Sequence, residues 1–208
     1  MGRFLGNVCK LCRREGMKLF LKGQRCFTNK CAVEKRDYPP GEHSARRSKV
    51  SEYGLRLREK QKLKRIYGLM ETQFRFVFSR AERIQGNTGE NLLVLLERRL
   101  DNVLLAAGFA LSRGQARQLI SHGHIHVNGH RITIPSYLVR SGDVITPQDR
   151  EKTKKAIKEA VDVNRSQQVP GWLEVDRDGY VAKINLLPRR EDVLHPIKEQ
   201  LIVELLSK

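Results

Sequence analysis

The spacing of apolar residues predicts that much of the chain is helical. Apolar side chains recur every three or four positions, which gives a helix one apolar face that can pack into a core. Polar and basic residues occupy the positions between them, so each helix keeps an outer face in water. The predicted helices span residues 51–68, 71–86, 89–108 and 113–122, and the spacing of 197, 201 and 205 predicts a final one.

From residue 124 onward the pattern changes to the alternation that strands show. Apolar and polar residues alternate on both sides of Asn128-Gly129, a dipeptide that favours a two-residue hairpin turn. In that register Ile125 faces Ile132, and basic and polar groups share the other side of the hairpin. We therefore expect two short antiparallel strands at this point.

A second hairpin is expected in WLEVDRDGYVAKI, residues 172–184, around its Asp-Gly turn. This register sets Glu174 opposite Lys183, a favourable cross-strand pair of opposite charges. Between the two hairpins, residues 137–145 read as a further strand and residues 152–161 as a short basic helix. The second half of the chain therefore predicts a small antiparallel sheet accompanied by helices.

Together these elements predict an α+β protein in three parts. Residues 1–50 form a basic N-terminal segment with too few apolar residues for a core of its own. Residues 51–95 form a mainly helical domain, which we expect residues 190–208 to complete. Residues 96–189 form a small α/β module with a helix, a hairpin and an antiparallel sheet.

The positive charge of the chain is concentrated near its start. The net charge is +17, and residues 1–65 hold 19 Lys and Arg against 6 Asp and Glu, so +13 of the charge lies in under a third of the 208 residues. This asymmetry indicates a polyanionic partner, either a nucleic acid or an anionic membrane. The longest apolar run, 92–96, is far shorter than the roughly 18 residues of a membrane span, and the first residues lack the apolar core of a signal peptide. We therefore expect a cytoplasmic protein without a membrane partner.

All four cysteines lie in this basic segment, as two pairs. Cys9 and Cys12 form a C-x2-C pair, and Cys26 and Cys31 form a C-x4-C pair thirteen residues later. Each pair can supply two corners of a tetrahedral thiolate site, and the nearby cations favour the thiolate forms. A bound metal would also organise a segment that lacks a core. The expected ion is Zn²⁺, with an iron–sulfur cluster as the alternative, and both are favoured over two disulfides or four unligated thiols.

The histidines and the known catalytic motifs add no second site. Four of the six histidines fall between His122 and His130, with no carboxylate or cysteine among them, so we interpret them as polar residues that face a partner rather than as metal ligands. His43 is not needed as a ligand, because four thiolates already complete a tetrahedron. The sequence contains no glycine-rich phosphate loop and no G-x-S-x-G motif. We therefore expect a binding protein and not an enzyme.

Residues 96–145 resemble a small RNA-binding module that consists of a helix and a hairpin. The resemblance begins with LERRLDNVLLAAGFALSRGQARQLI (96–120) and continues to residue 145. That module also occurs in some pseudouridine synthases and in tyrosyl-tRNA synthetases. Four further motifs follow the order of the bacterial small-subunit ribosomal protein four family: YPPGEH, SEYGLRLREKQKLKRIYG, TGENLLVLLERRLDNV and PIKEQLIVEL. With them the chain resembles that family over nearly its full length. Its cysteines are similar to the metal-binding amino terminus that some members have.

The resemblance implies a structural constituent of the small ribosomal subunit. It implies early binding to a multi-helix junction in the 5′ domain of small-subunit rRNA, which nucleates assembly there. The implied neighbours are ribosomal proteins five and three, which with it line the channel that messenger RNA enters, and the contact with protein five is tied to decoding accuracy. Some members also repress translation of their own mRNA. A zinc-finger transcription factor and an RNA-modifying enzyme are the alternatives that the residues leave open.

Folded RNA offers phosphate arrays and shape, which many Lys and Arg on rigid elements can match. Tyrosines in such a surface can stack on bases, and polar groups of the predicted helix and hairpin share its partner-facing side. The residues that we assign to RNA binding on these grounds are Arg3, Lys10, Arg13, Arg14, Lys22, Arg36, Tyr38, His43, Arg46, Arg47, Lys49, Tyr53, Arg56, Lys60, Lys64, Arg65, Arg113, Gln115, Arg117, His122, His124, Asn128 and Arg131.

Overall fold

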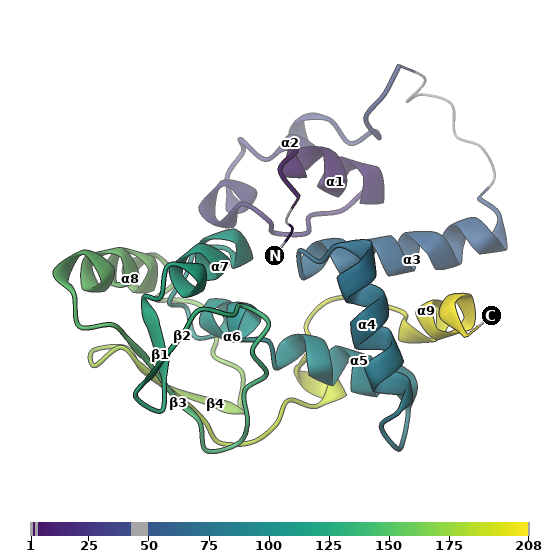
Figure 1. Cartoon of the computed structure of the whole chain (residues 1–208). Helices are drawn as coiled ribbons and strands as arrows, with labels where there is room; N and C mark the ends of the chain where they lie inside the picture. Colours follow the sequence, from purple (N-terminus) through teal and green to yellow (C-terminus); the bar gives the residue numbers. More distant parts are fainter. Residues whose placement is uncertain (1, 3, 43–49, 208) are drawn as a thin grey trace. The chain divides into compact units, whose positions relative to one another are not determined.

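The computed structural model describes residues 2, 4–42 and 50–207 (Figure 1). Its contacts divide the chain into two compact units, one of Met1–Leu92 with His195–Lys208 and the other of Leu93–Leu194. None of the helices in the described ranges combines the length and apolar character that crossing a membrane requires. Helices and an antiparallel sheet are both present, which agrees with the predicted α+β class.

All regular elements of the first unit, within the described residues, are helices. Helix α1 packs against α2 and α3, and α3 packs against α9 near the end of the chain, so Figure 1 shows α3 and α9 side by side. Helix α5 begins in this unit and ends in the other. The elements are α1 (Val8–Glu15), η1 (Gly23–Phe27), α2 (Ala32–Lys35), α3 (Glu52–Ile66), α4 (Glu71–Glu82), α5 (Thr88–Glu97) and α9 (Glu199–Leu206).

Local chemistry sets the ends of α3, since Ser is a residue type that caps a helix start and Gly suits a left-handed turn at its end. The Ser51 hydroxyl accepts a hydrogen bond from the Gly54 N–H at 3.1 Å, which satisfies one of the free donors at the start of the helix. Gly68 follows the helix with φ of +63°, a left-handed conformation that glycine adopts without steric cost. Leu63 and Ile66 on the inner face are buried, whereas Leu55, expected on the same apolar side, is exposed.

The core of this unit draws on helices far apart in sequence. Phe74, Phe78 and Ala81 of α4 are buried, as is Ile202 of α9. The predicted helix over 71–86 would place Ile84 on the same apolar side as Phe74 and Phe78, and this prediction is wrong. The helix ends at Glu82, so Ile84 leaves the helical face and lies exposed.

The prediction of one continuous helix over 89–108 is also wrong. Helix α5 ends at Glu97, and a separate α6 (Leu100–Ala106) follows. Between them Arg99 is extended, with φ of −66° and ψ of 134°, and it forms an isolated antiparallel bridge with Leu138. The Leu100 N–H donates to the Tyr137 carbonyl at 2.9 Å instead of to its own helix. Hydrogen bonds to a distant segment therefore replace those that would continue the helix.

The second unit is built around one five-stranded antiparallel sheet. Its strand order is β2-β1-β3-β5-β4, so each hairpin lies at one side and β3 joins them. The elements are α6, α7 (Arg113–Ser121), β1 (Ile125–Val127), β2 (His130–Ile132), β3 (Val144–Pro147), α8 (Glu151–Val163), β4 (Leu173–Asp176), β5 (Val181–Ile184) and η2 (Arg190–Asp192).

Both predicted hairpin registers are confirmed. Ile125 pairs with Ile132 in the first hairpin, and Glu174 pairs with Lys183 in the second. The strand predicted over 137–145 is correct only at its end, since β3 begins at Val144. The residues before it form a turn in which the Asp143 carboxylate accepts the Arg140 N–H at 2.7 Å.

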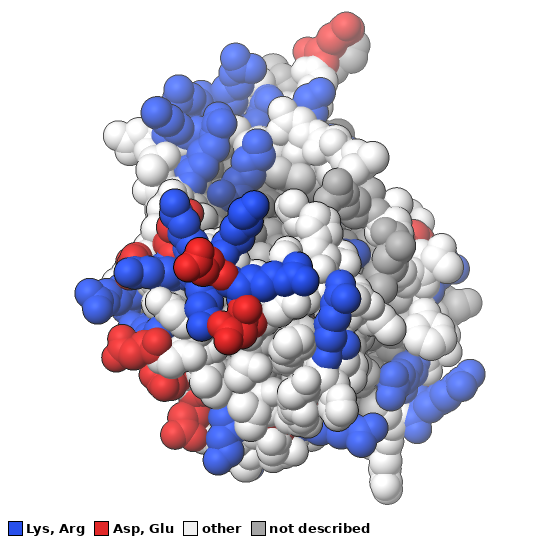
Figure 2. Space-filling view, turned by 60° about the vertical axis from the view of Figure 1, so that its left-hand side comes forward, with Lys and Arg blue, Asp and Glu red and all other residues white. Residues whose placement is uncertain are grey.

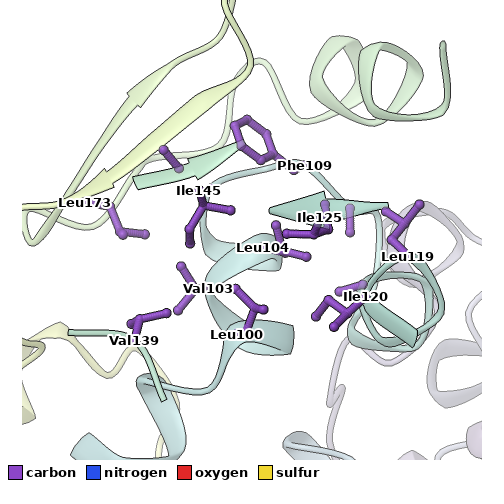
Figure 3. Packing of buried hydrophobic residues seen from close by; sticks show 14 of the residues in the cluster. Leu100, Val103, Leu104, Phe109, Leu119, Ile120, Ile125, Val139, Ile145 and Leu173 are labelled. Atoms are coloured by element: carbon purple, nitrogen blue, oxygen red, sulfur yellow. The ribbon is translucent and has the colours of Figure 1, made fainter. Parts of the chain in front are cut away.

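The core of this unit lies between its helices and the sheet. Figure 3 shows Leu104 of α6 and Ile120 of α7 in the same cluster as Ile125 and Ile145 of the strands. All four side chains are fully buried. Ser112 caps α7 by accepting the Gln115 N–H at 3.3 Å. This packing fixes α7 and the first hairpin relative to each other within the unit.

Candidate nucleic-acid interface and metal centre

The four cysteines lie on or beside three short helices of the N-terminal segment. Cys9 and Cys12 lie one turn apart on α1, Cys26 lies in η1, and Cys31 directly precedes α2. Cys12, Cys26 and Cys31 are buried, and all four thiols are free. The other three thiols are near enough to influence the pKa of Cys12. Both sequence pairs thus lie within one short segment, residues 9–31.

The environment of Cys12 favours the neutral thiol in the absence of a metal. Burial raises the pKa of Cys12, a hydrogen bond from the Leu19 backbone lowers it, and the three neighbouring thiols raise it. The expectation that nearby cations keep this thiol ionised is therefore not met for Cys12. Within the described ranges, no group of three or more His, Cys, Asp or Glu side chains is close enough to hold a metal ion. The donor set itself, four thiols and mostly buried, suits a soft ion such as zinc, which displaces thiol protons on binding.

Arg13 links α1 to the segment that follows α2. Its Nε donates to the Tyr38 carbonyl at 3.0 Å and its Nη2 to the Pro39 carbonyl at 3.3 Å. The guanidinium also lies over the Tyr38 ring, 4.9 Å from its centroid. A cation–π contact of this kind adds to the hydrogen bonds. Two residues assigned to RNA binding thus hold the fold of this segment together.

Three of the cations assigned to RNA binding on α3 form ion pairs within the protein. Lys60 Nζ lies 2.5 Å and Lys64 Nζ 2.9 Å from the Glu71 carboxylate. Arg56 Nε lies 2.8 Å from Glu204 on α9. Lys60 is buried, so its ammonium is not presented to a partner in this structure.

Arg65, at the end of α3, pairs with Glu15 of α1, beside Arg58. Burial raises the pKa of the Glu15 carboxyl even though two guanidinium groups lie beside it. Burial likewise lowers the pKa of Arg65. Desolvation therefore outweighs the attraction in both groups, which is typical of an ion pair removed from water. Arg65 connects two helices of the unit.

The polar face of α7 is also engaged in contacts within its unit. Arg113 Nε donates to Asn102 Oδ1 at 2.9 Å, and Arg117 Nη1 lies 3.5 Å from the Asp101 carboxylate. Only 12% of the Arg117 side chain is exposed, so the expected open basic face is partly closed. Gln115 Oε1 accepts the Leu111 N–H at 2.7 Å and helps to start the helix.

Polar residues in and next to the first hairpin that are assigned to RNA binding also form contacts within the protein. His124 Nδ1 and Thr153 Oγ1 of α8 are 3.0 Å apart, and burial, followed by the nearby His122, lowers the pKa of His124. Arg131 Nη2 donates to the His122 carbonyl at 3.3 Å. His122 and Arg131 remain exposed on their outer sides.

Asn128 has a structural role at the hairpin turn. It has a positive φ of 51°, its Nδ2 donates to Asp143 Oδ1 at 2.9 Å, and its Oδ1 accepts the Val144 N–H at 2.8 Å. These bonds tie the β1–β2 turn to the start of β3. An RNA contact by Asn128 therefore stays a prediction beside an evident role in the fold.

A further set of the assigned residues is exposed. It consists of Lys10, Arg14, Lys22, Arg36, Tyr38 and Tyr53. Arg3, His43, Arg46, Arg47 and Lys49 lie outside the described residues. Figure 2 shows one face on which blue Lys and Arg side chains are abundant, with red acidic side chains beside some of them.

Sequence reasoning assigned no role to several exposed cations on regular elements. Arg75, Arg80 and Arg83 lie along α4 or at its end, and Lys152, Lys155 and Lys158 lie three apart on α8. Residues at that spacing lie along one side of a helix, so the α8 set was readable from the sequence. The exposed Phe20 and Phe27 were missed as well, although they stand among basic residues.

A cation-rich helical unit and a helix-and-hairpin module on a small sheet define a nucleic-acid-binding protein. The family described as "Ribosomal protein S4/S9 N-terminal domain" matches residues 3–97, and the "S4 domain" matches residues 98–145. The chain is 56% identical to the small ribosomal subunit protein uS4 of Trichlorobacter lovleyi, and 57% and 58% identical to those of Caldicellulosiruptor bescii and Caldicellulosiruptor saccharolyticus. Each comparison covers 208 residues and 100% of both chains. The chain belongs to the uS4 family of small ribosomal subunit proteins, a family of structural proteins and not of enzymes.

Proposed function

We propose that the protein is a structural constituent of the small ribosomal subunit, in the cytoplasm, that binds small-subunit rRNA. The observation that carries this proposal is the identity of 56–58% with uS4 proteins over the whole length of both chains. The physical support is the net charge of +17, with Lys10, Arg14, Lys22 and Arg36 exposed in the most basic segment. The transcription-factor and RNA-modifying alternatives are disfavoured, because relatives of the same length carry the ribosomal name.

The finer proposal is that the protein binds early to a multi-helix junction of the 5′ domain and nucleates assembly there. Its neighbours would be ribosomal proteins five and three and the messenger RNA that enters between them, with an effect on decoding accuracy. Repression of its own mRNA is an optional further role. Exposed cations on helices, held at fixed separations, are the feature that supports recognition of a folded junction.

Salt-dependent binding tests this proposal. For the cognate junction, log affinity should fall with log salt at a slope steeper than about −4, since each phosphate contact contributes about −0.7 to −0.9. Replacing Lys10 and Arg14 together by Gln should weaken binding and flatten the slope. The matched control is Glu191→Gln, an exposed acidic residue expected to have little effect. A flat salt response, or equal affinity for an unstructured strand, would refute recognition of a folded RNA.

We also propose that Cys9, Cys12, Cys26 and Cys31 hold one Zn²⁺. Zinc would supply a rigid link between α1, η1 and α2, which the apolar residues of this segment are too few to provide. The two sequence pairs in one short segment and the burial of Cys12, Cys26 and Cys31 support this assignment.

Metal analysis of anaerobically purified protein tests the zinc proposal. It should give one zinc per chain, and Cys12→Ser should lose the metal together with protection of residues 8–35 from proteolysis. Stoichiometric iron with a brown colour would replace zinc by an iron–sulfur cluster. Metal-free protein with an equally protected segment would refute both.

A further inference from the structure

Two aromatic rings are paired on the surface of the N-terminal segment. The ring centroids of Phe20 and Phe27 are 5.1 Å apart, with 30° between the ring planes. Phe27 is 75% exposed and Phe20 40% exposed, although each directly follows a buried residue, Leu19 and Cys26 respectively. Leu19 and Cys26 therefore point into the segment, and the two rings that follow them point into water. The Phe27 ring is paired with Phe20, and most of its surface is still open to water.

The backbone holds this pair in place. Phe20 has a φ of 51°, a left-handed conformation that a bulky residue rarely adopts. Such a conformation persists only where the surrounding structure imposes it, and it is concentrated at functional sites. Phe27 is the last residue of η1, next to the Thr28 N–H that donates to the Arg25 carbonyl at 3.4 Å. The ring pair is thus a feature of the fold and not a chance contact of mobile side chains.

The charge around the rings favours an anionic partner. Lys22, Arg25 and Lys30 are exposed within the same short segment as the rings. The sequence has no Asp or Glu between Gly16 and Val33. An apolar surface of another protein would leave these cations without compensation, whereas a nucleic acid supplies a flat apolar base and phosphates together.

We propose that the Phe20–Phe27 pair is a stacking platform for one unpaired base of the bound RNA, with Lys22, Arg25 and Lys30 meeting the phosphates beside it. This inference rests on the proposed function, because it names an interaction within the same RNA complex. Unstacked bases in loops and bulges present both faces to protein aromatics, and every base has such a face. The platform would thus add recognition of shape to a surface otherwise dominated by charge.

Binding of the small-subunit rRNA junction across a salt series tests the proposal. Phe27→Leu keeps apolar bulk but removes the aromatic face, so affinity should fall about 5- to 140-fold, the range that one stacked base represents. The slope of log affinity against log salt should stay unchanged, because no ion is released by stacking. Phe27→Tyr should restore binding. Lys22→Gln with Lys30→Gln should instead flatten the slope by about 0.7–0.9 for each phosphate that the protein no longer neutralises.

Phe76 on α4 is the matched control. It is 71% exposed and has no ring partner among the described residues. Phe76→Leu should change affinity by less than about two-fold, as for ordinary surface substitutions. Equal losses from Phe76→Leu and Phe27→Leu would overturn the platform, and so would binding by Phe27→Leu within about two-fold of the parent chain.

Photochemical crosslinking of the unaltered chain provides a second measurement that does not depend on variants folding. Short-wavelength irradiation of the complex should link a base to Phe20 or Phe27, identified by mass spectrometry of the peptide. A crosslink map without that peptide would overturn the proposal. Failure of the unaltered chain to bind the junction at all would instead refute the proposed function, and the platform with it.

Discussion

Replacing Glu71 by Gln perturbs a carboxylate of the first unit that pairs with three cations. Its oxygens lie 2.5 Å from Lys60 Nζ, 2.9 Å from Lys64 Nζ and 3.3 Å from Arg75 Nε. Burial alone would raise its pKa, but the hydrogen bonds and charges of Lys60 and Lys64 lower the pKa of Glu71 from 4.5 to about 2. The carboxylate is thus more stable as an anion in the folded chain than in the unfolded chain.

The magnitude follows from that change in pKa. The fall from 4.5 to about 2 corresponds to about 3.4 kcal/mol at about 1.36 kcal/mol per pKa unit. Because 37% of the Glu71 side chain is exposed, solvent screens the interaction, and we expect about 1–2 kcal/mol. The loss of a partner for Lys60, whose side chain is only 7% exposed, acts in the same direction.

The pH dependence gives the sharper test. A carboxyl whose pKa is lowered by folding stabilises the fold above its unfolded value of 4.5 and loses that contribution as pH falls toward about 2. Urea unfolding followed by helical circular dichroism should show the full difference between the parent and Glu71→Gln at pH 7. More than half of that difference should disappear at pH 3.

The control is Glu82→Gln on the same helix, since Glu82 makes no ion pair within the described part of the chain. It should change the free energy of unfolding by no more than about 0.5 kcal/mol. Equal effects of the two substitutions, or a Glu71→Gln difference that is the same at pH 7 and pH 3, would refute the ion-pair account.

Three further substitutions test the second unit, each by urea unfolding followed through Trp172 fluorescence. Asp101→Asn should cost about 3–5 kcal/mol, because Arg99, 2.7 Å away and only 4% exposed, would keep a buried charge without its partner; an unchanged midpoint would contradict this. Gly123→Ala should cost about 1–2 kcal/mol, because φ is +75° and a Cβ would collide with the guanidinium of Arg131; Gly114→Ala, where a Cβ would lie at an ordinary contact distance of 3.7 Å from Ser112 Oγ, is its control. Asn128→Ala should cost about 1–3 kcal/mol by leaving Asp143 and Val144 short of a hydrogen-bond partner, and Asn128→Asp should not recover this loss, because its carboxylate would face the carboxylate of Asp143.

Features decided by neighbours in sequence were predictable. The caps at Ser51 and Ser112 and the turn at Gly68 depend on residues within one helical turn, so the sequence states them directly. The register of both hairpins follows from the position of the turn and the alternation of apolar residues. The grouping of all cysteines in one basic segment was equally visible in the sequence.

Features decided by distant segments were not predictable. The break between α5 and α6 depends on Leu138 and Tyr137, some forty residues further along, whose backbone groups pair with Arg99 and Leu100. Helical periodicity does not predict such a break, because Leu96, Leu100 and Val103 keep a helical spacing across it. In the same way, the spacing of Lys60 and Lys64 along α3 does not indicate that Glu71 forms ion pairs with both of them.

The sequence by itself determined the family, the positive charge and the local elements, since each depends on residue identity or short-range spacing. The tertiary structure alone decided which cations remain for a partner. Lys60, Arg65 and Arg117 are held by acidic groups of the protein, whereas Lys10, Lys22 and Arg36 are exposed. The physical reason is that an ion pair requires two side chains to meet within a few ångströms, and only the packing of helices brings together charges that the chain keeps apart.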